Sequence, residues 1–151
     1  MRADLPDEQV LVSPILQVGS GPLVISFVHR FSFENGGWDG GVVELSNDNG
    51  ITWTDIGVGA YNGSTSAITT APIGQSRPAF VNRSVGWPNF GNASLNLGTT
   101  YANQDVRIRF RIGTDESQGA PGWDVDDISV SGITNTPFAA LVPNAVVCAA
   151  P

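Results

Sequence analysis

The sequence predicts an all-β fold, an antiparallel two-sheet β-sandwich of the jelly-roll type. Apolar and polar side chains alternate along many short segments, as in strands that bury one face. No segment free of Gly and Pro has the spacing of an amphipathic helix, so parallel β-α-β units are excluded. The 18 Gly and 10 Pro are scattered, which suits tight turns between short strands. Two packed sheets are the natural closure for such strands.

The alternation also places the individual strands. The best-defined ones are expected at residues 10–15, 23–31, 42–46, 51–56, 93–97, 106–112 and 123–131. Pro14 favours an edge position for the first of these, because proline donates no ladder hydrogen bond. Val24 and Val28 give the second strand an apolar second face, which indicates a central strand. Residues 47–50 (Asn-Asp-Asn-Gly) separate the third and fourth strands and predict a hairpin.

We expect one domain with an appended segment. Residues 1–132 are expected to form the sandwich, and 133–151, where the alternation fades, a linker or an extra strand that pairs with something outside it. Residues 57–92 are the longest irregular stretch and are rich in Gly, Ser, Asn and Pro. Long loops on a sandwich are frequent binding sites.

Charge narrows the classes of partner. The chain has 14 acidic and 7 basic residues, all of the latter Arg, for a net charge of -7. An acidic domain repels phosphate backbones, so no nucleic acid partner is expected. Excess carboxylate suits a hard cation such as calcium. No apolar run approaches the about 20 residues of a membrane helix, so no membrane span is expected.

The cysteine count points to a compartment. Cys148 is the single cysteine, so no intrachain disulfide forms. Secreted eukaryotic modules of this size usually carry disulfides, and their absence favours a bacterial exported protein. No apolar signal sequence follows Met1, so we expect a piece of a longer polypeptide.

Two acidic segments are candidates for a calcium site. Glu34 and Asp39 lie in a Gly-rich turn between two expected strands, and Asp126 and Asp127 lie within an otherwise apolar strand. Burying an unpaired carboxylate is costly, so such a side chain needs a hydrogen bond, an ion pair or a metal. Calcium takes six to eight oxygen ligands, which carboxylates and the carbonyls of Gly-rich turns supply. The alternative is that Asp126 or Asp127 accepts backbone N–H bonds from the turn.

The order of several motifs resembles a known family. The motifs are F-x-F-E-x-x-x-W-D-G-G-V-V-E-L-S-x-D-x-G-x-x-W at 31–53, Y-N-G at 61–63, V-R-I-R-F-R at 106–111 and G-W-x-V-D-D-I at 122–128. Over residues 20–131 the chain resembles the MAM-like jelly-roll accessory domains of bacterial secreted proteins, including immune inhibitor A metalloproteases. The resemblance implies a non-catalytic domain, with calcium near Glu34, Asp39, Asp126 and Asp127. No H-E-x-x-H motif occurs, so protease activity is not implied.

Two further patterns concern strands and their turns. Residues 46–53 fit the S-x-D-x-G-x-x-W pattern of the Asp box of sialidase-like propellers. A propeller repeats this box in each blade, so the single copy here is interpreted as hairpin architecture. Arg107, Arg109 and Arg111 share one strand face. They could meet an anionic glycan or a partner's carboxylates, or pair with cross-strand acids.

Aromatic and nucleophilic residues complete the candidates. Trp87 and Tyr61, in the long loop region, are candidates to stack on a sugar, and the alternative is that they plug the ends of the sandwich. His29 is the single His and shares an apolar strand face, which indicates a core or interface residue. Without a plausible base we expect no enzyme.

The sequence as a whole favours a non-catalytic extracellular module for adhesion or accessory binding, part of a larger exported bacterial protein and stabilised by calcium. Its partners would be other domains of that protein, or a cell-surface protein or glycan. One alternative is a carbohydrate-binding module that uses the aromatic loop. Another is a structural subunit that self-assembles when residues 133–151 add a strand to the next copy.

Overall fold

The structure is a computed structural model that describes residues 7–116 and 118–137. These residues form ten strands and no helix, so this part of the chain has no helix long and apolar enough to cross a membrane. The strands are β1 (Asp7–Val12), β2 (Leu16–Gln17), β3 (Val24–Ser32), β4 (Gly40–Ser46), β5 (Thr54–Asp55), β6 (Gly63–Ser64), β7 (Pro78–Ala79), β8 (Gly91–Asn96), β9 (Asp105–Thr114) and β10 (Gly122–Ser131).

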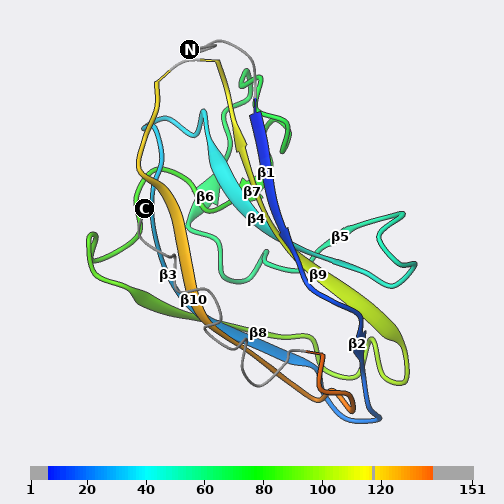
Figure 1. Ribbon diagram of the computed structural model, residues 1–151. Coiled ribbons are helices and arrows are strands. Elements are labelled where there is room, and N and C mark those ends of the chain that lie inside the picture. The colour runs from blue at the N-terminus through cyan, green and yellow to red at the C-terminus, as the bar shows by residue number, and fades with distance from the viewer. Residues whose placement is uncertain (1–6, 117, 138–151) are drawn as a thin grey trace, which may run out of the picture.

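The strands form two main antiparallel sheets and a small third one. The first sheet has the order β1-β9-β4-β5, with β2 also paired to β9, and the second has the order β10-β3-β8. Strands β6 and β7 pair with each other. Figure 1 shows the two main sheets as separate layers that approach each other near β2. The all-β sandwich expected from the sequence is confirmed, and its jelly-roll connectivity stays a prediction.

The main core lies between the two large sheets. Along β3 every second side chain, among them Ile25, Phe27 and Phe31, is buried in it. From the opposite sheet, Ile108 and Phe110 of β9 pack into the same cluster. Each such side chain contributes about 1.5–3 kcal/mol when fully buried. The period-2 pattern of the sequence therefore specifies which face of each sheet turns inward.

The outer face of the first sheet is covered as well. All seven residues of β4 are buried, which a strand with one water-facing side would not show. Val42, on the outer face, packs in a second apolar cluster with Ala71, Ile73, Ala79 and Val81. The long loop region that the sequence suggested for binding thus forms, over residues 57–81, a layer that closes this face.

Most strand expectations are confirmed. β3 is the central strand of its sheet, as predicted. The early strand expected at 10–15 lies at an edge, but it spans Asp7–Val12 and ends before Pro14. The strand expected at 51–56 is reduced to Thr54–Asp55. The reason is that the Asp48 carboxylate accepts hydrogen bonds from the backbone N–H and the hydroxyl of Thr52, which holds the chain in the turn up to that residue.

The segment after the domain begins in contact with it. Ile133 bridges Val18 in antiparallel fashion, and the Thr134 N–H donates to the carbonyl of Gln17 at 2.8 Å. The remainder of the expected linker or extra strand, with Cys148, lies outside the described residues.

Candidate metal site

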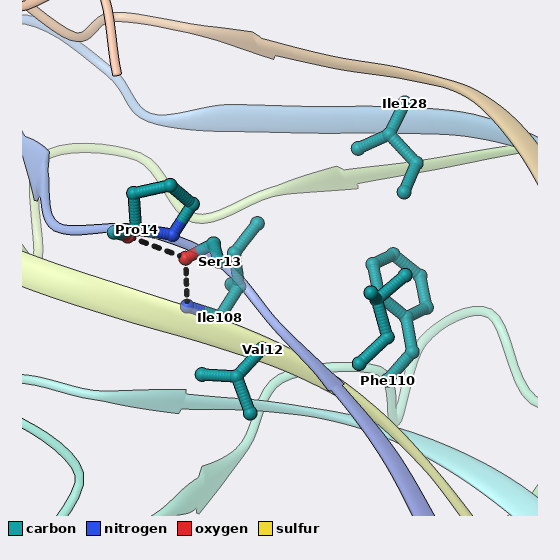
Figure 2. A pocket seen from close by; sticks show the side chains of 7 residues that line it. Val12, Ser13, Pro14, Ile108, Phe110 and Ile128 are labelled. Carbon is teal, nitrogen blue, oxygen red and sulfur yellow. Dashed lines mark hydrogen bonds between the residues drawn. The ribbon is translucent and has the colours of Figure 1, made fainter. Parts of the chain in front are cut away.

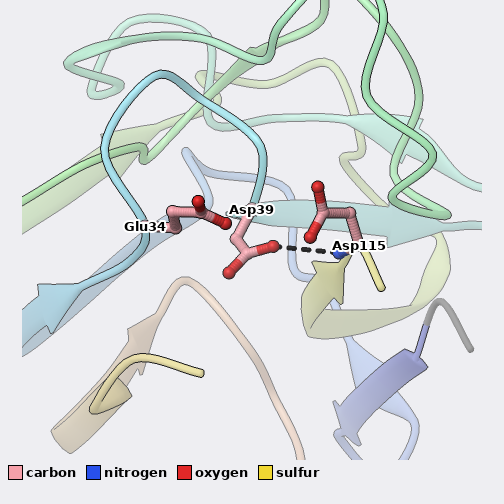
Figure 3. A group of neighbouring side chains, drawn as sticks. All are labelled: Glu34, Asp39 and Asp115. Carbon is pink, nitrogen blue, oxygen red and sulfur yellow. Dashed lines mark hydrogen bonds between the residues drawn. The ribbon is translucent and has the colours of Figure 1, made fainter. Parts of the chain in front are cut away.

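Three carboxylates meet at one end of the sandwich, as Figure 3 shows. Glu34 follows β3, Asp39 precedes β4 and Asp115 follows β9. In the antiparallel β4–β9 pair, Gly40 lies opposite Gly113, so the residues just beyond that pair of positions are neighbours. The turn between β3 and β4 then returns Glu34 to the same place. The site is therefore a product of sheet pairing between segments far apart in sequence.

The cluster concentrates negative charge around one buried carboxylate, that of Asp39, while Glu34 and Asp115 are half-buried. One carboxylate oxygen from each of the three residues lies within 4.8 Å of the others. Asp39 is 3% exposed and its Oδ1 accepts the Asp115 N–H at 2.9 Å. Among the described residues, the buried Glu34 Oε2 has no hydrogen-bond partner. Burial raises the pKa of Asp39, and the charges of Asp115 and Glu34 raise it further against opposing backbone hydrogen bonds.

The Gly-rich turn that carries Glu34 and Asp39 is held by the covering loop. Gly37 has a φ of +73°, and a Cβ there would lie 2.8 Å from the Ser64 carbonyl oxygen, so only glycine fits. The Gly37 carbonyl accepts the Ser66 N–H at 2.8 Å, and the Trp38 carbonyl accepts the Thr69 hydroxyl. These bonds fix the turn and thereby the relative positions of its two acids.

The second predicted acidic pair lies elsewhere. Asp126 is opposite Val28 in the β10–β3 pair, four positions along the strand from Gly122, which is opposite Ser32. Asp126 and Asp127 lie at a register shift and both are exposed, and Asp127 has a φ of +47°. Both lie within a strand, as expected, but their exposure removes the argument that burial obliges them to have a partner, and their role as metal ligands stays a prediction. The Asp127 N–H instead donates to the Asp126 carboxylate at 2.8 Å.

The structure thus brings Glu34 and Asp39 together and adds Asp115, which the sequence reasoning missed. A signal was available: the charged strand at 106–112 extends by two residues to Thr114, and Asp115 follows directly. Three carboxylates, two from the turn before β4 and one that follows β9, are hard oxygen ligands of the kind that calcium takes.

The arginine stripe has partners within the protein. Arg109 Nε contacts Glu44 Oε2 at 2.6 Å, Arg77 Nη2 contacts Glu44 Oε1 at 2.7 Å, and Arg111 Nη1 lies 3.6 Å from the same carboxylate. Glu44 is 3% exposed. Burial alone would raise the pKa of Glu44, but the hydrogen bonds from Arg77 and Arg109 outweigh it and hold the pKa below 4.5. This is the cross-strand pairing weighed from the sequence.

The remaining contacts of the stripe are also intramolecular. Arg111 Nη2 pairs with Glu8 at 2.9 Å, and Arg107 Nε donates to the Asn49 side chain at 2.9 Å. The Arg109 guanidinium lies over the Trp53 ring, 4.2 Å from its centre. Ligand binding by Arg107, Arg109 or Arg111 would therefore compete with contacts already formed.

The two loop aromatics do not form a common site. The Tyr61 hydroxyl donates to Asp55 at 2.7 Å and accepts the Val43 N–H at 2.9 Å, and its ring meets Phe80 edge to face. Burial raises the pKa of Tyr61. Tyr61 is thus a packing residue at the sheet. Trp87 lies elsewhere, with its ring centre 5.6 Å from the Arg30 guanidinium carbon.

Two structural interpretations of sequence features agree with the geometry. His29 is buried and its Nδ1 accepts the Trp123 Nε1–H at 3.2 Å, while burial lowers its pKa below 6.5. In the Asp-box turn, Gly50 has a φ of +94° and Trp53 Nε1 donates to the Gly50 carbonyl. Hydrogen bonds from Thr52 and Ser46 lower the pKa of Asp48 to about 2.

The chain was also compared with known proteins. No family model matches it, and no curated protein matches it. A proposal for its role therefore rests on the sequence motifs and on the geometry of the described residues.

Proposed function

We propose that this chain is a non-catalytic β-sandwich module of an exported bacterial protein, used for adhesion or accessory binding and stabilised by calcium. The observation that carries the calcium part is the convergence of Glu34, Asp39 and Asp115 around one point, with Asp39 buried. Calcium there would bind the turn between β3 and β4 to the end of β9, adding to the hydrogen bond from the Asp115 N–H to Asp39.

The charge balance of the site supports a cation. Three carboxylates so close repel one another, and burial weakens their solvation. Among the ion pairs found in the described residues, none joins an arginine to Glu34 or Asp39. An external cation would offset the mutual repulsion of the three carboxylates, and carboxylates suit hard ions such as calcium. Waters and backbone carbonyls would complete its six to eight ligands.

The adhesion or accessory part rests on the motif resemblance. MAM-like domains of bacterial secreted proteins are non-catalytic companions of other domains, and the motifs at 31–53 and 122–128 occur here in the same order. The corresponding partners are other domains of the parent protein, or a cell-surface protein or glycan. Of the residues that the resemblance proposes for calcium, we retain Glu34 and Asp39 and replace the exposed Asp126 and Asp127 by Asp115.

Thermal unfolding in EDTA and then in excess calcium tests the site. Because a ligand of the native state stabilises it by mass action, calcium at 100 times its Kd adds about 2.7 kcal/mol. The melting temperature should rise with calcium, and the rise should vanish in Asp39→Asn and in Asp115→Asn. The matched control is the double variant Asp126→Asn and Asp127→Asn, which should keep the full rise.

The outcomes separate the two candidate ligand sets. No rise in the wild type removes the calcium site from the proposal. A rise that survives Asp39→Asn but disappears in the Asp126→Asn and Asp127→Asn variant restores the original assignment to β10. Magnesium in place of calcium tests selectivity, because magnesium demands a more regular octahedral shell.

A carbohydrate-binding function is the second candidate, favoured by one cluster. Phe90 is 46% exposed, and the Arg30 guanidinium carbon lies 4.7 Å from its ring centre and 5.6 Å from that of Trp87. Two rings around a cation offer stacking surface and a hydrogen-bond donor to a sugar. Binding on a glycan array that is lost in Trp87→Ala and kept in Tyr61→Phe would support this function. Equal binding by both variants would contradict it.

A further inference from the structure

The sheet β10-β3-β8 has a polar outer face that is open among the described residues. The exposed side chains on this face carry hydroxyl, amide or carboxylate groups, and they include Asn92, Ser94 and Asn96 of β8 and Asp124, Asp126 and Ser129 of β10. On the first sheet, by contrast, residues of the loop region over 57–81 pack on Val42 and close the outer face. The second sheet is therefore the one whose outer face a ligand can reach.

A shallow hollow of about 470 Å³ lies in this open face, where β3 and β8 pair. Ser26, Val28, Asn92 and Ser94 line it from these two strands, and Asp127 lines it from the register shift in β10. Ser26 and Ser94 are opposed in the register, and their hydroxyls lie 3.2 Å apart. The hollow thus combines two hydroxyls, an amide and a carboxylate with an apolar side chain, which is the composition of a small-molecule site.

Two aromatic rings lie at one end of the same face. The guanidinium carbon of Arg30, on the outer face of β3, lies 4.7 Å from the centre of the Phe90 ring and 5.6 Å from that of Trp87. Arg30 Nη1 also donates to the Pro88 carbonyl at 3.0 Å, which holds the aromatic loop against the sheet. Between Arg30 and Ser26 the strand extends about 13 Å. The rings and the hollow therefore form one surface that is longer than a single sugar.

The charges on this face indicate which ligands suit it. Arg30 is paired with Asp124 at 2.7 Å, so its charge is compensated within the chain. Asp126 and Asp127 add two exposed carboxylates, and the whole chain has a net charge of -7. Such a face repels an acidic polysaccharide. Neutral sugars suit it better, because their hydroxyls donate to carboxylates and accept from amides, and their C–H faces pack on exposed rings.

The other open hollow of the sandwich has a different chemistry. Figure 2 shows it between β1 and β10, with Val12, Phe110 and Ile128 among the side chains around it. The Ser13 hydroxyl donates to the carbonyl of the next residue and accepts the Ile108 N–H at 3.0 Å. The side chains that line this hollow therefore offer a sugar little beyond apolar contact, and the polar face of the second sheet is the better glycan site.

We propose that a neutral oligosaccharide binds along the outer face of β10-β3-β8, with one part stacked on Phe90 and Trp87 and another in the hollow beside Asn92 and Ser94. The inference rests on the carbohydrate-binding function proposed above. It adds the class of ligand, an uncharged chain of sugars, and a second subsite on the sheet.

Affinity gel electrophoresis against soluble polysaccharides tests the class of ligand. The panel contains the neutral polymers laminarin, xylan, galactomannan and dextran, with polygalacturonate as the acidic counterpart. At least one neutral polymer should retard the wild type, and polygalacturonate should not. High salt should leave the retardation unchanged, because binding of an uncharged ligand is not screened. Retardation by polygalacturonate alone, or binding that salt abolishes, would identify a charged partner and overturn the proposal.

Ser94→Leu tests the hollow separately from the rings. The leucine fills the hollow and removes a hydroxyl, so the Kd for the bound polysaccharide should rise at least about tenfold. Asn92→Ala removes only the amide and should weaken binding in the same direction. The matched control is Thr54→Leu, at an exposed position of β5 in the first sheet, which should bind like the wild type. Melting temperatures near that of the wild type would show that the variants are folded.

The outcomes distinguish the extended site from the carbohydrate-binding function itself. If Ser94→Leu and Asn92→Ala bind like the wild type while Trp87→Ala does not, the rings alone bind the sugar and the inference is wrong. If no polysaccharide of the panel retards the wild type, the inference and the carbohydrate-binding function both fail. Amide chemical shifts provide a readout without substitutions: changes confined to the Trp87 loop, with none around Ser26 and Ser94, would also overturn the second subsite.

Discussion

Glu44→Gln is expected to destabilise the protein strongly, because Glu44 is the anion shared by two mostly buried arginines. Its side chain is 4% exposed, and those of Arg77 and Arg109 are 22% and 17% exposed. Removing one partner of a buried ion pair costs about 3–5 kcal/mol. Asp55 still pairs with Arg77 at 2.8 Å, so the lower end, about 3 kcal/mol, applies here. For a domain of this size that corresponds to roughly 6–12 °C in melting temperature.

An exposed ion pair of the same length supplies the matched control. Arg30 Nε and Asp124 Oδ2 lie 2.7 Å apart, as do Arg77 Nη2 and Glu44 Oε1. The Asp124 side chain, however, is 54% exposed. Asp124→Asn should therefore cost less than about 1 kcal/mol, because solvent screens such pairs. The two variants differ chiefly in burial.

Urea and thermal unfolding at neutral pH, repeated in low and high salt, measure both costs. Salt should reduce the small cost of Asp124→Asn and leave that of Glu44→Gln almost unchanged, because buried pairs are screened less. If Glu44→Gln costs no more than Asp124→Asn, the covering loop does not bury Glu44 in solution, and the description of the closed outer face is wrong.

Two further predictions concern the core. The folded-state pKa of His29 is lowered by burial, so its stabilising contribution is complete above pH 6.5 and is lost as pH falls through its folded-state pKa. Glu44, with a pKa held below 4.5, adds a second loss in more acidic solution; a His29→Gln variant whose melting temperature follows the wild-type pH profile would contradict the first part. Gly41→Ala should cost about 1–3 kcal/mol, because its Cβ would lie 2.6 Å from the Trp123 ring. Gly59→Ala, with nothing within 4 Å, is the control, and equal denaturation midpoints for the two variants would contradict that reasoning.

The strands and their inward faces could be predicted from the sequence, because the alternation of apolar and polar side chains is a local property of each segment. The inward face of β3 (Ile25, Phe27, His29, Phe31) and the turn at residues 47–50 follow from neighbouring residues alone. The second layer over β4 was not readable, because residues 57–81 have no periodicity. From the sequence, Glu44 would be expected to face solvent. In the structure, Arg77 of that loop donates a hydrogen bond to it.

Only part of the candidate site could be predicted from the sequence, because only that part depends on residues that are close together in the chain. Glu34 and Asp39 lie on one short turn, so their separation of five positions in the sequence already predicts that they are close in space. Asp115 joins them only through the pairing of β4 with β9, which fixes Gly40 opposite Gly113. Asp126 and Asp127 were assigned from the apolar residues around them, but the register shift in β10 exposes both. Local hydrophobicity does not reveal such an irregularity.

Glu44 and Asp39 are both buried acidic residues at β4, and their negative charges are compensated in different ways. Glu44, in the middle of the strand, is neutralised by arginines of the chain itself, at 2.6 and 2.7 Å. At the start of the strand, Asp39 meets Glu34 and Asp115, and no ion pair found in the described residues brings an arginine to Asp39. A chain with 14 acidic residues, seven arginines and no lysine has few cations of its own to place there. A countercharge from solution would stabilise the ionised form of this partly buried cluster, which is the physical basis of the calcium proposal.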